Sequence, residues 1–165
     1  MSRLLALVSA LLCAAVLMAG CATPSKPGTM NGSEAWPWRG RMSVRVESQP
    51  VQSFTAGFEL SGNAGAGALT LYTPLGTTAA AMAWSPQLSL LRVNSQTQQF
   101  GSLGALMQQT LGTALPVEAL FAWLAGEPMA VPGWQVDLSQ RGQGRISARR
   151  QLPLPEAELR LAMEP

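Results

Sequence analysis

The stretch Ala68-Leu-Thr-Leu-Tyr-Thr-Pro-Leu-Gly-Thr-Thr-Ala-Ala-Ala-Met-Ala-Trp84 predicts two antiparallel strands joined by a tight turn. Its larger apolar residues recur at every second position of each arm: Leu69, Leu71, Met82 and Trp84. Alternation with a period of two is typical of half-buried strands. The connector Thr73-Pro74-Leu75-Gly76 suits a type I turn, with proline at its second position and glycine at its fourth. We therefore predict a hairpin at this place in the chain.

The leucine of this turn is its unusual feature. Leu75 falls at the outer corner, where a side chain tends to point away from both strands. An exposed leucine forgoes roughly 1.5–3 kcal/mol of burial. From the turn alone, two alternatives stay open: Leu75 folds back into the core, or it is kept outside to enter an apolar partner.

The first twenty residues have the pattern of an export signal. Arg3 is the only charge before residue 26, and an apolar run at 4–19 is followed by Gly20 and Cys21. The tetrapeptide Met-Ala-Gly-Cys at 18–21 resembles the lipobox of bacterial lipoproteins. That resemblance implies cleavage before Cys21 and attachment of lipid to its thiol.

The residues after Cys21 divide the chain further. Residues 22–33 hold small and polar residues with almost nothing to bury, so we expect a lipidated flexible tether at 21–35. Alanine rather than aspartate at position 22 resembles the lipoproteins that enteric bacteria sort to the outer membrane. The expected organisation is a signal peptide at 1–20, the tether at 21–35 and one folded domain at 36–165.

Composition argues against several classes of function. Without the leader the chain has ten basic and nine acidic residues, so no basic face and no nucleic-acid partner are expected. The chain contains no histidine, which removes the usual general base and the usual metal ligand. It carries no Gly-rich phosphate loop, Cys/His metal set or nucleophile elbow. We therefore expect neither an enzyme, nor a bound metal, nor a cofactor.

The period of the apolar pattern changes along the rest of the chain. Alternation predicts strands near 42–46, 54–60, 88–93 and 134–138, with a polar link at 94–99 and a solvated, cationic edge strand at 145–150. Helical spacing predicts a helix from about 103 to 111, capped by Ser102 and ended by Gly112, and a second from 117 to about 124, ended by Gly126. The simplest interpretation is that both helices cover one face of the sheet.

Several of these motifs, in this order, resemble the LolB family of outer-membrane lipoprotein receptors. They are Gly40-Arg41 before the first strand, the Leu71–Thr77 turn, the Leu-Pro-Val helix at 115–128 that carries Trp123, and Gly133-Trp134-Gln135-Val136. The helix motif is the most specific of them. The resemblance covers roughly residues 38–163. The chain departs from it in the short 126–134 link and in lacking a late aromatic residue.

The resemblance implies a fold and a function. The fold would be mainly β with α, an incomplete antiparallel β-barrel of the LolA/LolB kind with helices covering an apolar cavity. The function would be to accept lipoproteins from a LolA-like periplasmic carrier and insert them into the outer membrane from its periplasmic face, as a monomer. Carried over by motif, Pro74, Leu75 and Gly76 form the membrane-inserting loop and favour an exposed leucine.

The expected acyl-chain cavity draws on both strands and helices. Its candidate lining residues are Met42, Val44, Val46, Phe54, Phe58, Leu69, Leu71, Met82, Trp84, Leu120, Phe121 and Trp123. Each is also what an ordinary core residue looks like, and this alternative stays open. A second function stays open as well: a passive structural or assembly-partner lipoprotein with no lipid cavity. A periplasmic hydrolase is disfavoured by the missing histidine.

Overall fold

The computed structural model describes residues 37–164. The expected signal peptide at 1–20, the lipidation site Cys21 and the tether at 21–35 lie outside the described residues. The described residues belong to one compact unit, residues 32–165. Every residue of its hydrophobic core falls between 38 and 163. The described residues therefore carry a hydrophobic core of their own.

Nine antiparallel strands form one open sheet. They are β1 (Trp38–Val46), β2 (Gln52–Gly62), β3 (Gly67–Tyr72), β4 (Thr78–Ser85), β5 (Leu88–Val93), β6 (Gln96–Phe100), β7 (Trp134–Asp137), β8 (Arg145–Arg150) and β9 (Ala157–Met163). Their order across the sheet is β6-β5-β4-β3-β2-β1-β9-β8-β7. Because β6 and β7 do not pair, the sheet stays open, which confirms the incomplete antiparallel barrel expected from the sequence.

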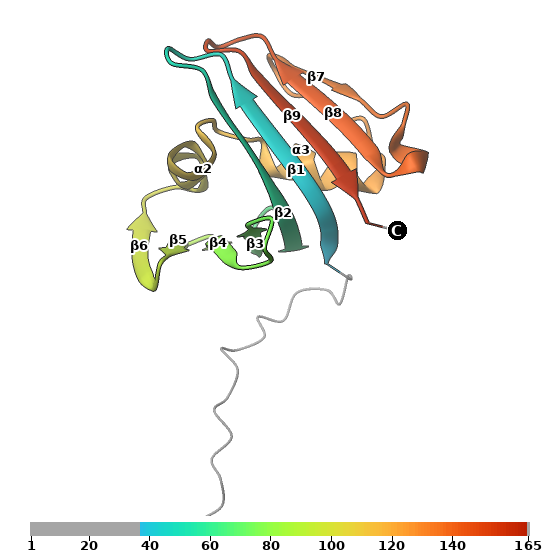
Figure 1. Ribbon diagram of the computed structural model, residues 1–165. Helices are drawn as coiled ribbons and strands as arrows, with labels where there is room; N and C mark the ends of the chain where they lie inside the picture. Colours follow the sequence, from blue (N-terminus) through green and yellow to red (C-terminus); the bar gives the residue numbers. More distant parts are fainter. Residues whose placement is uncertain (1–36, 165) are drawn as a thin grey trace, which may run out of the picture. The chain divides into compact units, whose positions relative to one another are not determined.

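Two helices carry the chain from one edge of the sheet to the other. Strands β1 to β6 follow one another as hairpins, after which α2 (Leu103–Leu111) and α3 (Val117–Ala125) lead to β7 at the opposite edge. A connection between the two edges must cross a face of the sheet. Figure 1 shows both helices on the same side of the strands, and we call this side the inner face. The expectation that the helices cover one face is confirmed.

Local sequence fixes both ends of the helices. The Ser102 hydroxyl accepts a hydrogen bond from the Ala105 backbone N–H at 3.1 Å, as an N-cap does. Gly112 and Gly126 close α2 and α3 in the left-handed conformation that glycine adopts most easily. None of the described helices is long and apolar enough to cross a membrane.

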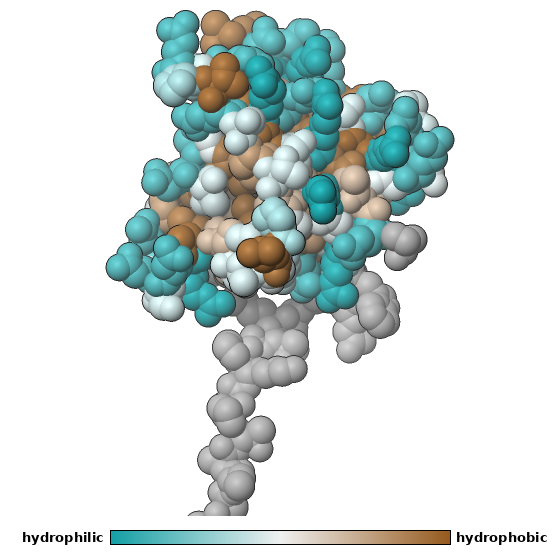
Figure 2. Space-filling model, viewed as in Figure 1, coloured by the Kyte–Doolittle hydropathy of each residue, from teal (hydrophilic) through white to brown (hydrophobic). Residues whose placement is uncertain are grey.

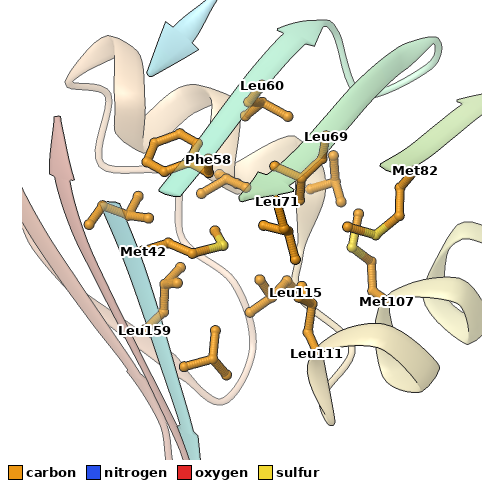
Figure 3. Packing of buried hydrophobic residues seen from close by; sticks show 14 of the residues in the cluster. Met42, Phe58, Leu60, Leu69, Leu71, Met82, Met107, Leu111, Leu115 and Leu159 are labelled. Atoms are coloured by element: carbon orange, nitrogen blue, oxygen red, sulfur yellow. The ribbon is translucent and has the colours of Figure 1, made fainter. Parts of the chain in front are cut away.

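Side chains alternate between the two faces as the period of two predicts. In β1, Met42, Val44 and Val46 are buried toward the helices, while Arg41 and Arg45 are exposed on the outer face. The buried side chains of the strands and helices form a single cluster, part of which is shown in Figure 3. The core therefore lies between the sheet and the two helices.

Two local predictions were wrong. The polar link expected at 94–99 is the edge strand β6, paired with β5 through a turn in which Asn94 and Ser95 have positive φ. Its first four residues, Gln-Thr-Gln-Gln, are exposed and only Phe100 is half-buried, so the strand carried no apolar alternation that would have predicted it. Strand β8, expected at an edge, lies between β9 and β7, and its cationic residues divide between the two faces.

Candidate functional site

The turn between β3 and β4 is held by a closed set of hydrogen bonds. The Gly76 backbone N–H donates to the Thr73 carbonyl at 2.9 Å, as in a type I turn, and the Thr73 N–H donates to the Thr77 carbonyl at 2.9 Å. The two threonine hydroxyls lie 2.8 Å apart. Gly76 has a φ of 80°, so the loop is a type I turn followed by a left-handed glycine. The predicted turn is confirmed.

Leu75 points away from the protein. Its side chain is 92% exposed, the largest exposure among the large hydrophobic residues of the described chain. No burial compensates for placing it in water, while the turn that presents it is rigidly bonded. Figure 2 shows how little of the visible face is strongly hydrophobic. The structure thus excludes a Leu75 that folds back into the core, and its entry into an apolar partner stays a prediction.

The twelve residues expected to line a cavity all face the interior. Ten of them are buried, and Phe54 and Phe121 are half-buried and packed against the same cluster. Figure 3 shows Met42 and Phe58 from β1 and β2 facing Leu69 and Leu71 from β3, with Met82 opposite Met107 of α2. These side chains contact one another as a packed core. A hollow of about 540 Å³ opens beside this cluster, between β1, β2 and α2, and its lining includes Val44, Val46 and Phe54.

The two helices differ in how they are held. Helix α3 is fixed by polar contacts: the Arg141 guanidinium donates to the Leu124 carbonyl, and the Trp123 indole N–H donates to the Met129 carbonyl at 3.0 Å. Within residues 37–164, no hydrogen bond or ion pair joins α2 to the sheet. Helix α2 is therefore attached by apolar packing through residues such as Leu106 and Met107. Apolar packing of this kind is non-directional, unlike the hydrogen bonds that hold α3.

Sequence reasoning missed a buried arginine beside α3. Arg150 is only 7% exposed, and its guanidinium lies 5.8 Å from the ring centre of Trp134, which packs at 6.1 Å on Trp123. Its Nη2 donates to the Pro155 carbonyl at 2.8 Å, whereas its Nε has no partner among the described residues. Burial lowers the pKa of the Arg150 guanidinium. Arg150 continues the alternation of Ile146 and Ala148, which are buried. This period of two was the sequence signal that Arg150 faces inward.

Comparison with known proteins adds to this geometry. The family described as "Outer membrane lipoprotein LolB" matches residues 34–160, which include the Leu75 turn and both helices. The chain belongs to the LolB family. This confirms the resemblance drawn from the motifs.

Individual LolB proteins are similar over most of this chain. Outer-membrane lipoprotein LolB of Bordetella pertussis is 33% identical over 117 residues, covering 69% of this chain and 59% of that protein. The Ralstonia nicotianae protein of the same name is 33% identical over 148 residues, covering 85% and 69%. The Shewanella loihica protein is 29% identical over 124 residues, covering 71% and 56%. The chain thus spans less than two thirds of the length of some of the LolB proteins it matches.

The LolB-like helix motif has a clear structural role. Residues 115–128 form α3 with its flanking caps, and the motif tryptophan, Trp123, is 1% exposed beneath the sheet edge at β7. Sequence spacing placed Trp123 off the main apolar stripe, yet it is among the most buried large side chains. Its indole N–H bond to Met129 explains why a tryptophan is accommodated there.

Proposed function

We propose that this chain is an outer-membrane lipoprotein that receives lipoproteins from a LolA-like soluble carrier and inserts them into the outer membrane. The name shared by its relatives, outer-membrane lipoprotein LolB, supports the location and the lipoprotein character. The exposed Leu75 on a rigid turn is the single observation that supports insertion most strongly. In this proposal Cys21 carries the lipid anchor, residues 21–35 are the tether, and the domain works as a monomer on the periplasmic face.

The interior between sheet and helices is the proposed binding site for acyl chains. Each methylene moved from water into an apolar interior is worth about 0.8 kcal/mol, so a bare chain is never released into water. Displacement of α2 would expose Met82 and Met107, and methionine repacks readily around different apolar shapes. The residues that form the core of the free protein would then line the cavity that holds the bound acyl chain.

Leu75 is proposed to act at the exit. Burying one leucine side chain in the hydrocarbon region gains about 2 kcal/mol. That is too little to anchor a protein, which the lipid on Cys21 would do. It is enough to favour orientations in which the loop touches the bilayer during delivery.

A passive structural lipoprotein is the second candidate function. It is supported by the interior, whose buried side chains form one contiguous cluster among the described residues. A titration of a fluorescent acylated peptide into the protein distinguishes the two functions, because they predict different results. Saturable binding supports transfer, and absence of binding supports the passive alternative.

Delivery is tested by a matched pair of leucine substitutions. Leu75→Glu places a charge on the proposed insertion loop, and Leu154→Glu places the same charge on a leucine that is 72% exposed on another proline-containing loop. We expect both variants to bind the acylated peptide, and only Leu75→Glu to lose its delivery to liposomes. Equal delivery by the two variants would contradict the insertion role of Leu75.

A further inference from the structure

On the outer face of the sheet, two arginines lie in one row of aligned residues, with a small residue between them. We call this row the arginine row. The strand register aligns Tyr72, Gly57, Arg41, Ala162 and Arg145 across β3, β2, β1, β9 and β8. Two steps between neighbouring strands place the backbones of the two arginines about 10 Å apart. The small residue between them leaves room for both guanidinium groups to approach a common ligand.

A groove follows this row. A hollow of about 410 Å³ is lined by Arg41, Arg145 and Arg160 together with the hydroxyl-bearing Ser43 and Ser147. A second hollow of about 330 Å³ shares Arg41 and Thr55 with it and extends to the turn residues that flank Leu75. The groove is therefore continuous from the insertion turn to β8.

Most carboxylates in and beside the groove already have partners. Glu59 pairs with Arg39 at 2.8 Å, and Glu158 pairs with Arg160 at 3.0 Å and with Arg149 at 3.6 Å. Hydrogen bonds from Ser139 lower the pKa of the Asp137 carboxyl. Glu164 also lines the groove, at its turn end.

The two arginines that flank Ala162 have no such partners. Within residues 37–164, neither Arg41 nor Arg145 makes an ion pair. The groove thus holds two arginines that make no ion pair and a third, Arg160, on the strand between them, while Asp137 and Glu164 also contribute to its lining.

We propose that this groove binds the phosphate of a membrane lipid headgroup while Leu75 enters the bilayer. A guanidinium offers a planar fork of donors that matches phosphate oxygens, and serine hydroxyls complete such a site. Leu75 lies three residues beyond Tyr72, so their backbones are at most roughly 10 Å apart. The headgroup zone of a bilayer is about 5–8 Å deep on each side. Arg41 and Arg145 lie two and four strand steps from Tyr72, about 10 and 20 Å along the row. Because the row runs across the strands, a sheet that stands upright on the bilayer with Leu75 at the hydrocarbon edge holds both arginines at one depth, close to the phosphates.

The inference rests on the proposed function, and its test separates the two. The chain from residue 22 onward, which contains the whole folded unit, is sedimented with vesicles of phosphatidylcholine alone or with added phosphatidylglycerol. The groove variant is Arg41→Gln with Arg145→Gln. Arg92→Gln with Arg149→Gln is the control, because it removes the same charge from exposed strand positions outside the groove.

We expect phosphatidylglycerol to strengthen binding of the unchanged chain, and the groove variant to lose about twenty-five-fold in affinity, at about fivefold per arginine. The control should lose clearly less. If the two variants lose the same affinity for vesicles, the effect depends on net charge alone and the proposal is overturned. Inorganic phosphate is the second arm: competition by it at low millimolar concentration would assign the site to free phosphate instead.

Acylated-peptide binding is measured on the same samples. If the groove variant still binds the acylated peptide but binds vesicles more weakly, the result supports the headgroup site. Unchanged delivery to vesicles by Leu75→Glu, with an unchanged response to phosphatidylglycerol, would sink only the insertion role. If the groove variant binds vesicles normally but accepts less cargo from a carrier, the groove docks a protein and the headgroup proposal is wrong.

Discussion

The guanidinium of Arg141 donates two hydrogen bonds, at 3.1 and 2.9 Å, to the carbonyl oxygen of Leu124. This carbonyl lies in the last turn of α3, where backbone oxygens lack helical partners and a positive charge is favourable. The arginine follows β7 and precedes β8, so the contact ties the end of α3 to the sheet edge. It gives α3 a polar attachment that α2 does not have among the described residues.

Replacing this arginine should weaken the end of α3. Arg141→Ala removes two charge-assisted hydrogen bonds, so we expect the free energy of unfolding to fall by about 1–3 kcal/mol. Thermal and urea unfolding measure the change. Arg92→Ala, at an exposed strand position, should stay within about 0.5 kcal/mol of the unchanged protein. An Arg141 variant as stable as the Arg92 variant would show that the contact does not fix α3.

Weakening the cap of α2 should speed entry of acyl chains. Ser102→Ala removes the side-chain acceptor of the Ala105 N–H and should cost about 1 kcal/mol, which is about fivefold in the opening equilibrium of the helix. Hydrogen exchange of the α2 amides and stopped-flow uptake of a fluorescent acyl probe should both accelerate. Exchange in α3 should not change. Faster α2 exchange without faster uptake would assign entry to another part of the protein.

The glycine of the insertion turn should matter through its backbone alone. A Cβ on Gly76 meets no atom within 4 Å, but its φ of 80° is left-handed, so Gly76→Ala should cost about 1–2 kcal/mol or flatten the turn. Gly101 is equally open and has no positive φ, which makes Gly101→Ala the matched control. We expect only Gly76→Ala to lower delivery to liposomes. Gly76→Asn should recover part of it, because asparagine tolerates this conformation.

The buried Arg150 should be replaceable by an apolar residue of similar length. Arg150→Met removes a desolvated charge while keeping contact with Trp134, so its stability should stay within about 1 kcal/mol of the original. Arg150→Ala also removes the packing and should cost about 2 kcal/mol more than the methionine variant. Urea unfolding of the two variants measures this difference. Equal destabilisation by both would mean that the charge itself holds the loop through Pro155.

Alternation made most of the sheet predictable, and its exceptions show where it fails. Strand β1 and the β3–β4 hairpin each have one apolar face, so Met42 and Met82 could be placed inward from sequence. Strand β6 has no buried residue and pairs only through its backbone, which composition does not reveal. Strand β8 was misplaced because three of its six residues are arginines, although Arg150 shares its face with Ile146.

The functional site was predictable to different depths. The exposure of Leu75 followed from the turn type together with the family resemblance. Whether the interior is hollow or packed depends on volumes summed over many side chains from seven or more elements, and no pattern of spacing encodes that sum. The contrast between a bonded α3 and an apolar-packed α2 also required three dimensions, because Arg141 and Leu124 lie 17 residues apart.

The entry of acyl chains into the interior is tested most directly by photo-cross-linking. An acylated peptide with a diazirine on its terminal carbon is bound to the protein, irradiated, and the labelled residues are identified by mass spectrometry. We predict labelling of buried side chains at the α2–sheet contact, Met82 and Met107 above all. Labelling confined to exposed positions such as Leu75 and Leu154, with the interior untouched, would contradict the account.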